Sequence, residues 1–485
     1  EPESCTSELS RRCETPSGAL EYGGFDQEVS LAFGGTQTVR THHIRSRPHV
    51  QGDPAPLRLR HSAGELTDGA GLVLLRRLWD QLGLGRRLDE KGRGVPGVYR
   101  PSLWVEVWVA LLLYGGRWLD DLRLLRSRGV SRLFGWARVP DATTFGRFLR
   151  RAAGVLVPVL DELLWHVLRV RWRAVGVPRR VMLVLDSTVV VRYGTKQAGA
   201  EKGYNPKKPG RPSHHPLLAF LAETGDCVGV LWRPGSAGTA AGAVEWVQTL
   251  VARLRAAGAQ EITLRLDKGF FSKEMVETLE ALGVRYVLKV PDWPWVRARL
   301  GCFRRSARHT SSRETLWTTR TKLYGARLFS LERRRPLRAD SGELALETYE
   351  VTRRAHVLTN IAGIHALTAW RLYNRGAVVE HRIEELAQLG IGKTAVDDLG
   401  GNRLLWAMGA LAYQLLHVIR TSALTGSWRR AQPERLRSWI FRLPAKLTRH
   451  ARKTYVQLQR SEPLRAEFLH ALRSIAGLRA PPLGI

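Results

Sequence analysis

Two aspartates, each closing a short apolar run, are the residues of this sequence best suited to chemistry. Asp186 follows the run 181–185, and Asp267 follows the run 262–266. Short apolar runs predict buried strands, and in an open α/β sheet reactive side chains gather beyond the strand ends. Two adjacent strands would bring these carboxylates together although 267 − 186 = 81 positions separate them. Because unpaired carboxylates repel each other, a hard cation such as Mg²⁺ suits the pair.

Each aspartate also has a simpler interpretation. Aspartate after a strand often caps a helix or begins a turn, because its side chain accepts hydrogen bonds from nearby backbone N–H groups. The two apolar runs do not decide between a turn residue and a catalytic one. Further motifs along the chain are needed.

The elements that would position the aspartates indicate a mixed α/β sheet. Strands are expected at 181–185, 217–221, 228–232, 262–266 and 284–290, with helices at 243–254 and 273–282. The order β-β-β-α-β-α-β is typical of a mixed sheet covered by helices. A turn at 224–226 separates the second strand from the third.

The flanking segments differ in composition and in expected secondary structure, and these differences suggest domain boundaries. We expect a flexible leader at 1–55, a helical DNA-binding domain at 56–175, a first catalytic part at 176–290, a β-rich insertion at 291–364, a second catalytic part at 365–420 and a basic helical region at 421–485. Within the first helical domain, Asp141 or Thr143 could cap a helix that continues through Leu149.

The charge predicts a polyanionic partner. The chain has 76 Lys and Arg against 44 Asp and Glu, a net charge of +32 spread along its length. Cations that neutralise phosphates release condensed counterions, so nucleic acid is the expected partner, although a GC-rich genome also raises the arginine content. The four cysteines form no metal pattern, and no apolar stretch is long enough to span a membrane. These features predict a cytoplasmic protein.

A basic loop follows the first aspartate strand. It contains Lys196, Lys202, Lys207, Lys208 and Arg211, interleaved with Tyr193 and Tyr204. Such a loop could contact a DNA backbone or could simply be solvated.

Three motifs in order carry a family resemblance. They are Val184-Leu185-Asp186-Ser187-Thr188, then Leu264-Arg265-Leu266-Asp267-Lys268-Gly269-Phe270, then Leu372-Tyr373-Asn374-Arg375-Gly376 through Glu380-His381-Arg382-Ile383. Over about residues 60–460, the sequence resembles the DDE transposases of bacterial insertion sequences. The resemblance is greatest to the thirteen-eighty group, in the IS-four-like superfamily. That class has an RNase H-like core interrupted by a β-rich insertion.

The resemblance implies that Asp186, Asp267 and Glu380 are the catalytic, metal-binding carboxylates. It also implies two Mg²⁺ ions per site, with Mn²⁺ as a substitute, that hold the attacking and leaving oxygens. Tyr373 and Glu380 are 380 − 373 = 7 residues apart, about two helical turns, so they would share one helix face. Glu384 and Glu385 compete with Glu380 for the third role, and a solvated acidic face is the alternative for all three.

The activity implied is that of a transposase. It would bind the terminal inverted repeats of an insertion sequence as a homodimer in a paired-end complex. It would then cleave double-stranded DNA and join the element's ends to target DNA. Gly376 and Ala387 stand where the class usually has Arg and Lys.

Because of these two departures, Arg375, Arg382 or Lys393 would supply the missing cation. The expected DNA contacts are Tyr373, Arg375, Arg382, Lys202, Lys207, Lys208 and Arg211. The departures also motivate a second hypothesis, a decayed or repurposed transposase that binds DNA without cutting it. A third is a nuclease that does not transfer strands.

Overall fold

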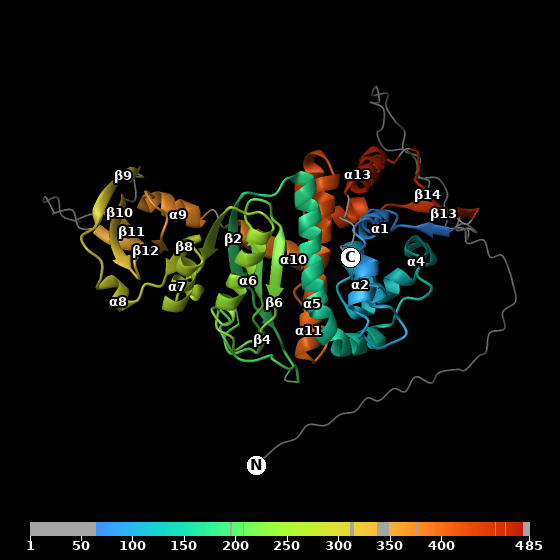
Figure 1. The fold of residues 1–485 in the computed structure, drawn as a ribbon, viewed down its shortest axis with the longest axis horizontal. Coiled ribbons are helices and arrows are strands. Elements are labelled where there is room, and N and C mark those ends of the chain that lie inside the picture. The colour runs from blue at the N-terminus through green and yellow to red at the C-terminus, as the bar shows by residue number, and fades with distance from the viewer. Residues whose placement is uncertain are drawn as a thin grey trace, which may run out of the picture. The chain divides into compact units, whose positions relative to one another are not determined.

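The apolar runs form the centre of a nine-stranded sheet in the computed structural model, with the order β6-β5-β2-β7-β8-β12-β11-β10-β9 (Figure 1). The structure describes residues 65–194, 196–206, 208–310, 315–336, 349–374, 377–451, 453–460 and 462–478. The expected leader at 1–55 lies outside these residues. So do Lys207 and Arg375, two of the expected DNA contacts.

The five central strands are β2 (Arg180–Ser187), β5 (Leu217–Leu221), β6 (Cys227–Leu231), β7 (Glu261–Leu266) and β8 (Arg285–Val290). β2, β7 and β8 run parallel to one another, whereas β5 and β6 pair antiparallel on the other side of β2. The predicted mixed α/β sheet is therefore confirmed. Two short strands, β3 (Val190–Val191) and β4 (Ser213–His214), form a separate ladder within the basic loop region.

Helices cover both faces of the central strands. Helices α6 (Ala243–Ala256) and α7 (Lys273–Ala281) pack on the face that carries Leu183 and Leu185. Val184 points to the opposite face, where α10 (Ala377–Gln388) and α11 (Leu399–Val418) lie. Because strand side chains alternate between faces, Asp186 belongs to the α10 face.

Four further strands extend the same sheet. They are β9 (Arg304–Thr310), β10 (Thr315–Leu323), β11 (Ala326–Pro336) and β12 (Tyr349–Thr359). β12 pairs antiparallel with β8, so the strands between 291 and 364 continue the central sheet (Figure 1). Short helix α8 (Pro294–Arg297) precedes them, and α9 (Ala366–Asn374) packs across β8, β10, β11 and β12.

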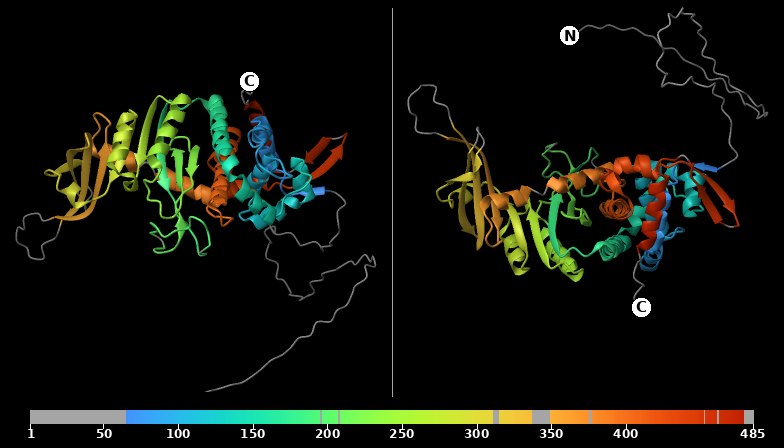
Figure 2. Two further views of the ribbon diagram at one scale, coloured as in Figure 1. Left: turned by 60° about the horizontal axis from the view of Figure 1, so that its bottom comes forward. Right: turned by 90° about the horizontal axis from the view of Figure 1, so that it is seen from above.

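Helices dominate the N-terminal part. The elements are α1 (Leu72–Gln81), α2 (Leu84–Lys91), α3 (Pro101–Tyr114), the 3-10 helix η1 (Leu119–Arg126), α4 (Arg128–Phe134) and α5 (Ala142–Val175). Asp141, one of the two candidate caps, accepts a hydrogen bond from the backbone N–H of Thr144 at 2.8 Å. The long helices α5 and α11 pack along each other, between the central sheet and the other N-terminal helices (Figures 1 and 2).

The C-terminal region, expected to be helical and basic, contains helices but also two strands that were not predicted. Its helical elements are η3 (Ile419–Ala423), η4 (Gly426–Arg430), α12 (Pro433–Leu436), η5 (Arg437–Phe441) and α13 (Arg465–Gly477). Strands β13 (Ala445–His450) and β14 (Lys453–Gln457) also form there, and β1 (Glu65–Thr67) joins them in a three-stranded sheet. Ala445 and Leu447 are buried at a period of two residues, which is the pattern of a half-buried strand. None of the described helices has the length and apolar character needed to cross a membrane.

A buried aspartate ties the turn between β5 and β6 to the long helices. Asp226 is fully buried and accepts hydrogen bonds from Arg171 Nη1 at 2.7 Å and Trp172 Nε1 at 2.9 Å, both on α5. Gln414 Nε2 on α11 donates a third at 2.7 Å. The charge of Asp226 is thus neutralised by α5 and hydrogen-bonded by both helices.

A buried glutamate on α10 extends this arrangement. Glu385 is 1% exposed and accepts from Arg382 Nη1 at 2.9 Å and Arg420 Nη2 at 3.1 Å. The Tyr413 hydroxyl donates to Glu385 at 3.0 Å. These partners hold the pKa of Glu385 below its usual value against the opposing effect of burial. Glu385 therefore fastens α10 to α11 and to the segment that follows it.

Replacing Glu385 with Gln should lower the free energy of unfolding by about 3–5 kcal/mol, because the buried Arg420 loses its counter-ion. Urea denaturation followed by circular dichroism would measure the loss. Glu384→Gln is a matched control, since the Glu384 side chain is 72% exposed beside Glu385. Equal stabilities for the two variants would contradict a structural role for Glu385.

Candidate active site

The register of two parallel strands sets the position of the two aspartates. Val184 of β2 lies opposite Arg265 of β7. Continuing both strands by two residues brings Asp186 level with Asp267, at the ends of neighbouring strands. Both side chains point to the α10 face, because positions two residues apart on a strand share a face.

Asp186 lies in surroundings that disfavour its negative charge. Its pKa is raised to about 6, chiefly by burial and further by the charges of Asp267 and Glu380. The backbone N–H of Ser187, which donates to Asp186 Oδ1 at 2.8 Å, and the charge of Arg265 oppose this rise. The ionised form of Asp186 therefore carries excess negative potential that a cation would relieve.

Asp267 is held from the side by Tyr373 and Lys289. The Tyr373 hydroxyl donates to Asp267 Oδ1 at 2.8 Å, and Lys289 Nζ lies 4.0 Å from the same oxygen. Burial, followed by the charge of Asp267, raises the pKa of Tyr373, so this hydroxyl stays protonated and remains a donor. Arg265 supports Tyr373 in turn, donating from Nε to its carbonyl oxygen at 2.6 Å and lying 4.7 Å from its ring centroid.

Sequence reasoning assigned no role to Arg265 or Lys289. Both interrupt apolar strand runs with a charge, and Arg265 stands two residues before Asp267, hence on the same face. A charged side chain inside an otherwise apolar strand is the signal that points to them.

Tyr373 and Glu380 lie on either side of two positions outside the described residues. Tyr373 lies in α9, described to Asn374, and Glu380 lies in α10, described from Ala377, so the single helix face expected from their offset stays a prediction. Tyr373 contacts Asp267, while the charge of Glu380 acts on Asp186.

The competing glutamates lie in different surroundings. Glu385 is buried in the ion network, and Glu384 is exposed, with Oε2 3.6 Å from His381 Nδ1. Glu380 is exposed on α10 and is the glutamate whose charge raises the pKa of Asp186. Arg382, an expected phosphate contact, is engaged with Glu385 instead of projecting freely.

The donor chemistry of this edge suits a divalent metal ion. Asp186 and Asp267 offer hard carboxylate oxygens, and their repulsion favours a cation between them. Among the described residues, no three or more His, Cys, Asp and Glu side chains stand at the spacing of a complete metal site. Asp186 and Asp267 are the residues here whose oxygens would suit a divalent metal ion.

The basic loop presents cations and aromatic rings to solvent. Lys202, Lys208 and Arg211 are exposed, and Tyr193 is 68% exposed. Lys208 Nζ lies 4.9 Å and Arg211 Cζ 5.7 Å from the Tyr193 ring centroid. This surface offers both phosphate-binding cations and a stacking face.

We expect Asp186→Asn to stabilise the metal-free protein at pH 7.5 by about 1–2 kcal/mol, because the ionised carboxylate is disfavoured in the fold. The folded pKa of about 6 lies above the ordinary value of 3.8. The wild type therefore loses stability as pH rises from about 4 to 6, and the gain from the substitution should vanish toward pH 4. Thermal unfolding in EDTA across this range measures it. A variant less stable than the wild type at pH 7.5 would count against the charge repulsion.

Comparison with known proteins identifies one family. The family model described as Transposase DDE domain group 1 matches residues 51–480. Among solved structures, the chain is similar to a piggyBac transposase in a synaptic complex with hairpin DNA. That similarity has a TM-score of 0.38 and 11% sequence identity, over 77% of this chain and 80% of that chain. No curated protein matches the sequence.

Proposed function

This chain belongs to the DDE transposase family, and from that premise we propose that it cleaves DNA at the ends of an insertion sequence and joins those ends to target DNA. The observation that carries the proposal is the parallel register of β2 and β7, which brings Asp186 level with Asp267. Glu380, near enough to raise the pKa of Asp186, is the third catalytic carboxylate.

We further propose an RNase H-like core of the thirteen-eighty group. The strand order β6-β5-β2-β7-β8 supports it, with β6 and β5 antiparallel and β7 and β8 parallel to β2. Strands β9 to β12, which come between β8 and the glutamate helix, correspond to the β-rich insertion of that class.

Asp186, Asp267 and Glu380 would hold two Mg²⁺ ions, or Mn²⁺ in their place. When bound, such ions stabilise charge on the attacking and leaving oxygens of a phosphoryl displacement. Tyr373 and Lys289 orient the Asp267 carboxylate so that its second oxygen stays available as a ligand. Glu380 projects from an exposed helix surface, so DNA can reach it without rearrangement of the core.

The partner proposed is double-stranded DNA, both the terminal inverted repeats and the target. The net charge of +32 and the exposed cations Lys202, Lys208 and Arg211 support contact with the phosphate backbone. Two copies of the chain would act together, as a homodimer in a paired-end complex, because two ends must be joined to one target.

Asp186→Asn, Asp267→Asn and Glu380→Gln should each reduce nicking of labelled element-end DNA by at least about a hundredfold. Each variant loses charge stabilisation worth several kcal/mol, and every 1.36 kcal/mol is tenfold in rate. The assay compares Mg²⁺, Mn²⁺ and EDTA, and binding to the same DNA is measured in parallel. Glu384→Gln, four residues from Glu380 on the same helix, should cut like the wild type.

The DNA products of this assay distinguish the proposed transposase from the two alternative hypotheses. DNA bound but never nicked by the wild type would identify a DNA-binding protein without catalysis. Nicked DNA without joined products would identify a nuclease. An Asp186→Asn variant that nicks DNA at the wild-type rate would contradict the proposed active site.

Lys208→Gln with Arg211→Gln should weaken binding of any duplex and lower the salt dependence of affinity. Each lost phosphate contact reduces the slope of log K against log salt by about one unit. Lys273→Gln is the control, because Lys273 is 67% exposed on α7, which covers the opposite face of the central strands. Unchanged slopes in the double variant would place the DNA path elsewhere.

A further inference from the structure

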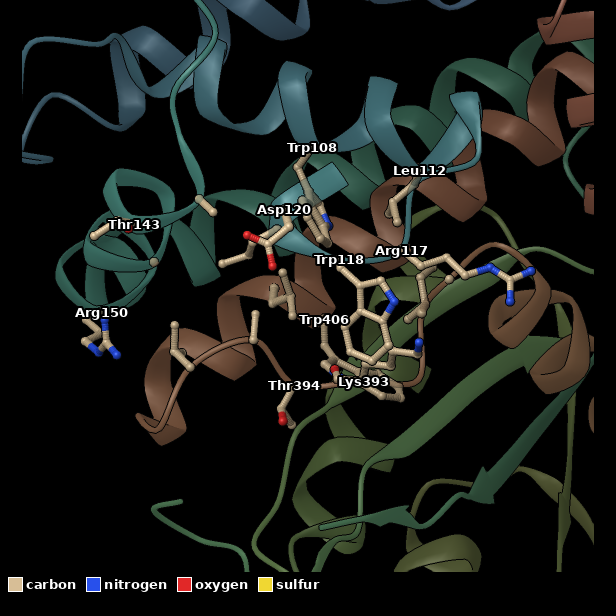
Figure 3. A pocket seen from close by; sticks show the side chains of 18 of the residues that line it. Trp108, Leu112, Arg117, Trp118, Asp120, Thr143, Arg150, Lys393, Thr394 and Trp406 are labelled. Atoms are coloured by element: carbon tan, nitrogen blue, oxygen red, sulfur yellow. The ribbon is translucent and has the colours of Figure 1, made fainter. Parts of the chain in front are cut away.

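A cavity of about 460 Å³ opens among the helices that adjoin the basic loop (Figure 3). Its lining comes from α3, from the start of η1, from the first turns of α5, from the segment 390–396 and from α11. Trp108, Leu112, Val396, Leu405 and Trp406 supply an apolar floor. The volume falls in the range of about 300–1,000 Å³ typical of small-molecule sites.

An exposed tryptophan stands at the mouth of this cavity with a lysine on its face. Trp118 is 52% exposed, and Lys393 Nζ lies 3.1 Å from its ring centroid (Figure 3). The backbone N–H of Trp118 donates to Asp121 Oδ2 at 2.9 Å, and the indole N–H of Trp406 donates to the Lys393 carbonyl oxygen at 3.0 Å. Both side chains therefore project from anchored backbone.

The rim of the cavity is cationic. Arg117 and Arg150 line it but already pair with Glu434 and Asp397, at 3.4 Å and 2.7 Å. Arg147 is exposed on the rim, and among the described residues neither it nor Lys393 forms an ion pair, although the charge of Asp121 favours the protonated form of Lys393. Burial, and after it the charge of Arg117, lower the pKa of Lys393, so an anion beside its ammonium would be favourable.

One carboxylate and two hydroxyls complete the lining. Asp120 is exposed on one side of the cavity, and Thr143 and Thr394 lie on others. Asp120 opposes an anion near itself, but a carboxylate can accept hydrogen bonds from amino groups at the edge of a base. The cavity thus combines an aromatic stacking face, a cation for an anion and acceptors for a base edge.

The cavity wall is continuous with the basic loop. Gln197 Nε2 donates to Thr394 Oγ1 at 2.8 Å and to the Val396 carbonyl at 2.9 Å. The Ala198 N–H donates to the Asp397 carbonyl at 2.7 Å. The start of the basic loop therefore contacts the wall of the cavity directly.

We propose that this cavity binds a single unpaired nucleotide, with the base stacked on Trp118 and its phosphate between Lys393 and Arg147. A paired base inside a duplex cannot enter a pocket of this size, whereas one base with its sugar can. The adjoining loop favours a nucleotide of a DNA strand over a free mononucleotide, which shares the same chemistry. This inference rests on the proposed action on DNA.

The test compares two duplexes of equal charge, one flush-ended and one with a single unpaired 2-aminopurine, in EDTA so that nothing is cut. Base stacking on an aromatic side chain contributes about 1–3 kcal/mol, which is roughly 5- to 150-fold in affinity. The wild type should prefer the unpaired base about tenfold and should quench its fluorescence. Trp118→Ala should abolish the preference and leave flush-duplex affinity within about twofold. Lys393→Gln should reduce the preference for the unpaired base.

Two further variants serve as controls. Trp118→Phe should restore part of the preference, because phenylalanine keeps a stacking face. Trp439→Ala should keep all of it, since Trp439 is 57% exposed but does not line the cavity. No preference in the wild type, or equal losses in Trp118→Ala and Trp439→Ala, would overturn the proposal.

Competition with deoxyadenosine monophosphate distinguishes the two sources of the nucleotide. Failure to displace the DNA at a hundredfold excess supports a site for a nucleotide within a strand. If deoxyadenosine monophosphate displaces the DNA at equal concentration, the cavity is a nucleotide pocket for free mononucleotides and not for a nucleotide within a strand. The binding readout is independent of cleavage, so loss of nicking with an intact preference overturns the proposed function alone.

Discussion

The burial of two carboxylates, Asp226 and Glu385, is the constraint that ties the central sheet to the helices α5, α10 and α11. An ion removed from water costs several kcal/mol unless opposite charges and hydrogen-bond donors surround it. Arg171 meets Asp226, and Arg382 and Arg420 meet Glu385, so the sheet, α10 and α11 fit in one arrangement. Glu380 is five residues before Glu385 on α10, and its position follows from that anchor.

The turn between β5 and β6 shows how tightly this arrangement is packed. Gly225 has a backbone φ of +72°, and an added Cβ would lie 2.9 Å from the Arg382 guanidinium. Glycine meets both demands, since it has no Cβ and populates positive φ readily. The turn between β5 and β6 is thus also the place where Arg382 of α10 packs against the sheet.

Charge has opposite effects at the two kinds of carboxylate. Around Glu385 the positive partners are built into the fold, and the pKa of Glu385 falls. Around Asp186 burial, together with the charges of Asp267 and Glu380, outweighs the effect of Arg265, and the pKa of Asp186 rises. The fold thus holds the ionised Asp186 carboxylate in a disfavoured state, which is a cost to stability that a functional site can carry.

Much of the core could be predicted from sequence because its strands are short apolar runs with clear ends. The same pattern identified Asp186 and Asp267, since each is the first polar residue after such a run. Asp226 was predicted only as part of a turn, and Glu385 as a competitor of Glu380 or as part of a solvated acidic face. Their partners, Arg171 and Arg420, are 55 and 35 residues away in sequence, and no local pattern pairs them.

Local patterns failed in one other place for a related reason. The hairpin β13–β14 lies in a segment whose many basic residues obscure an alternation only a few residues long. The pairing of β13 with β1, hundreds of residues earlier in the chain, is a tertiary contact that no local spacing contains.

The distance in sequence between Glu385 and Arg420 has a consequence for how the protein is made. During translation, β2 and β7 can pair soon after residue 266 has left the ribosome, which brings the two aspartates together. The helix that carries Glu380 gains its buried counter-ion only after Arg420 has emerged. A growing or prematurely terminated chain therefore lacks the ion pair that docks the helix of Glu380, even when β2 and β7 have already formed.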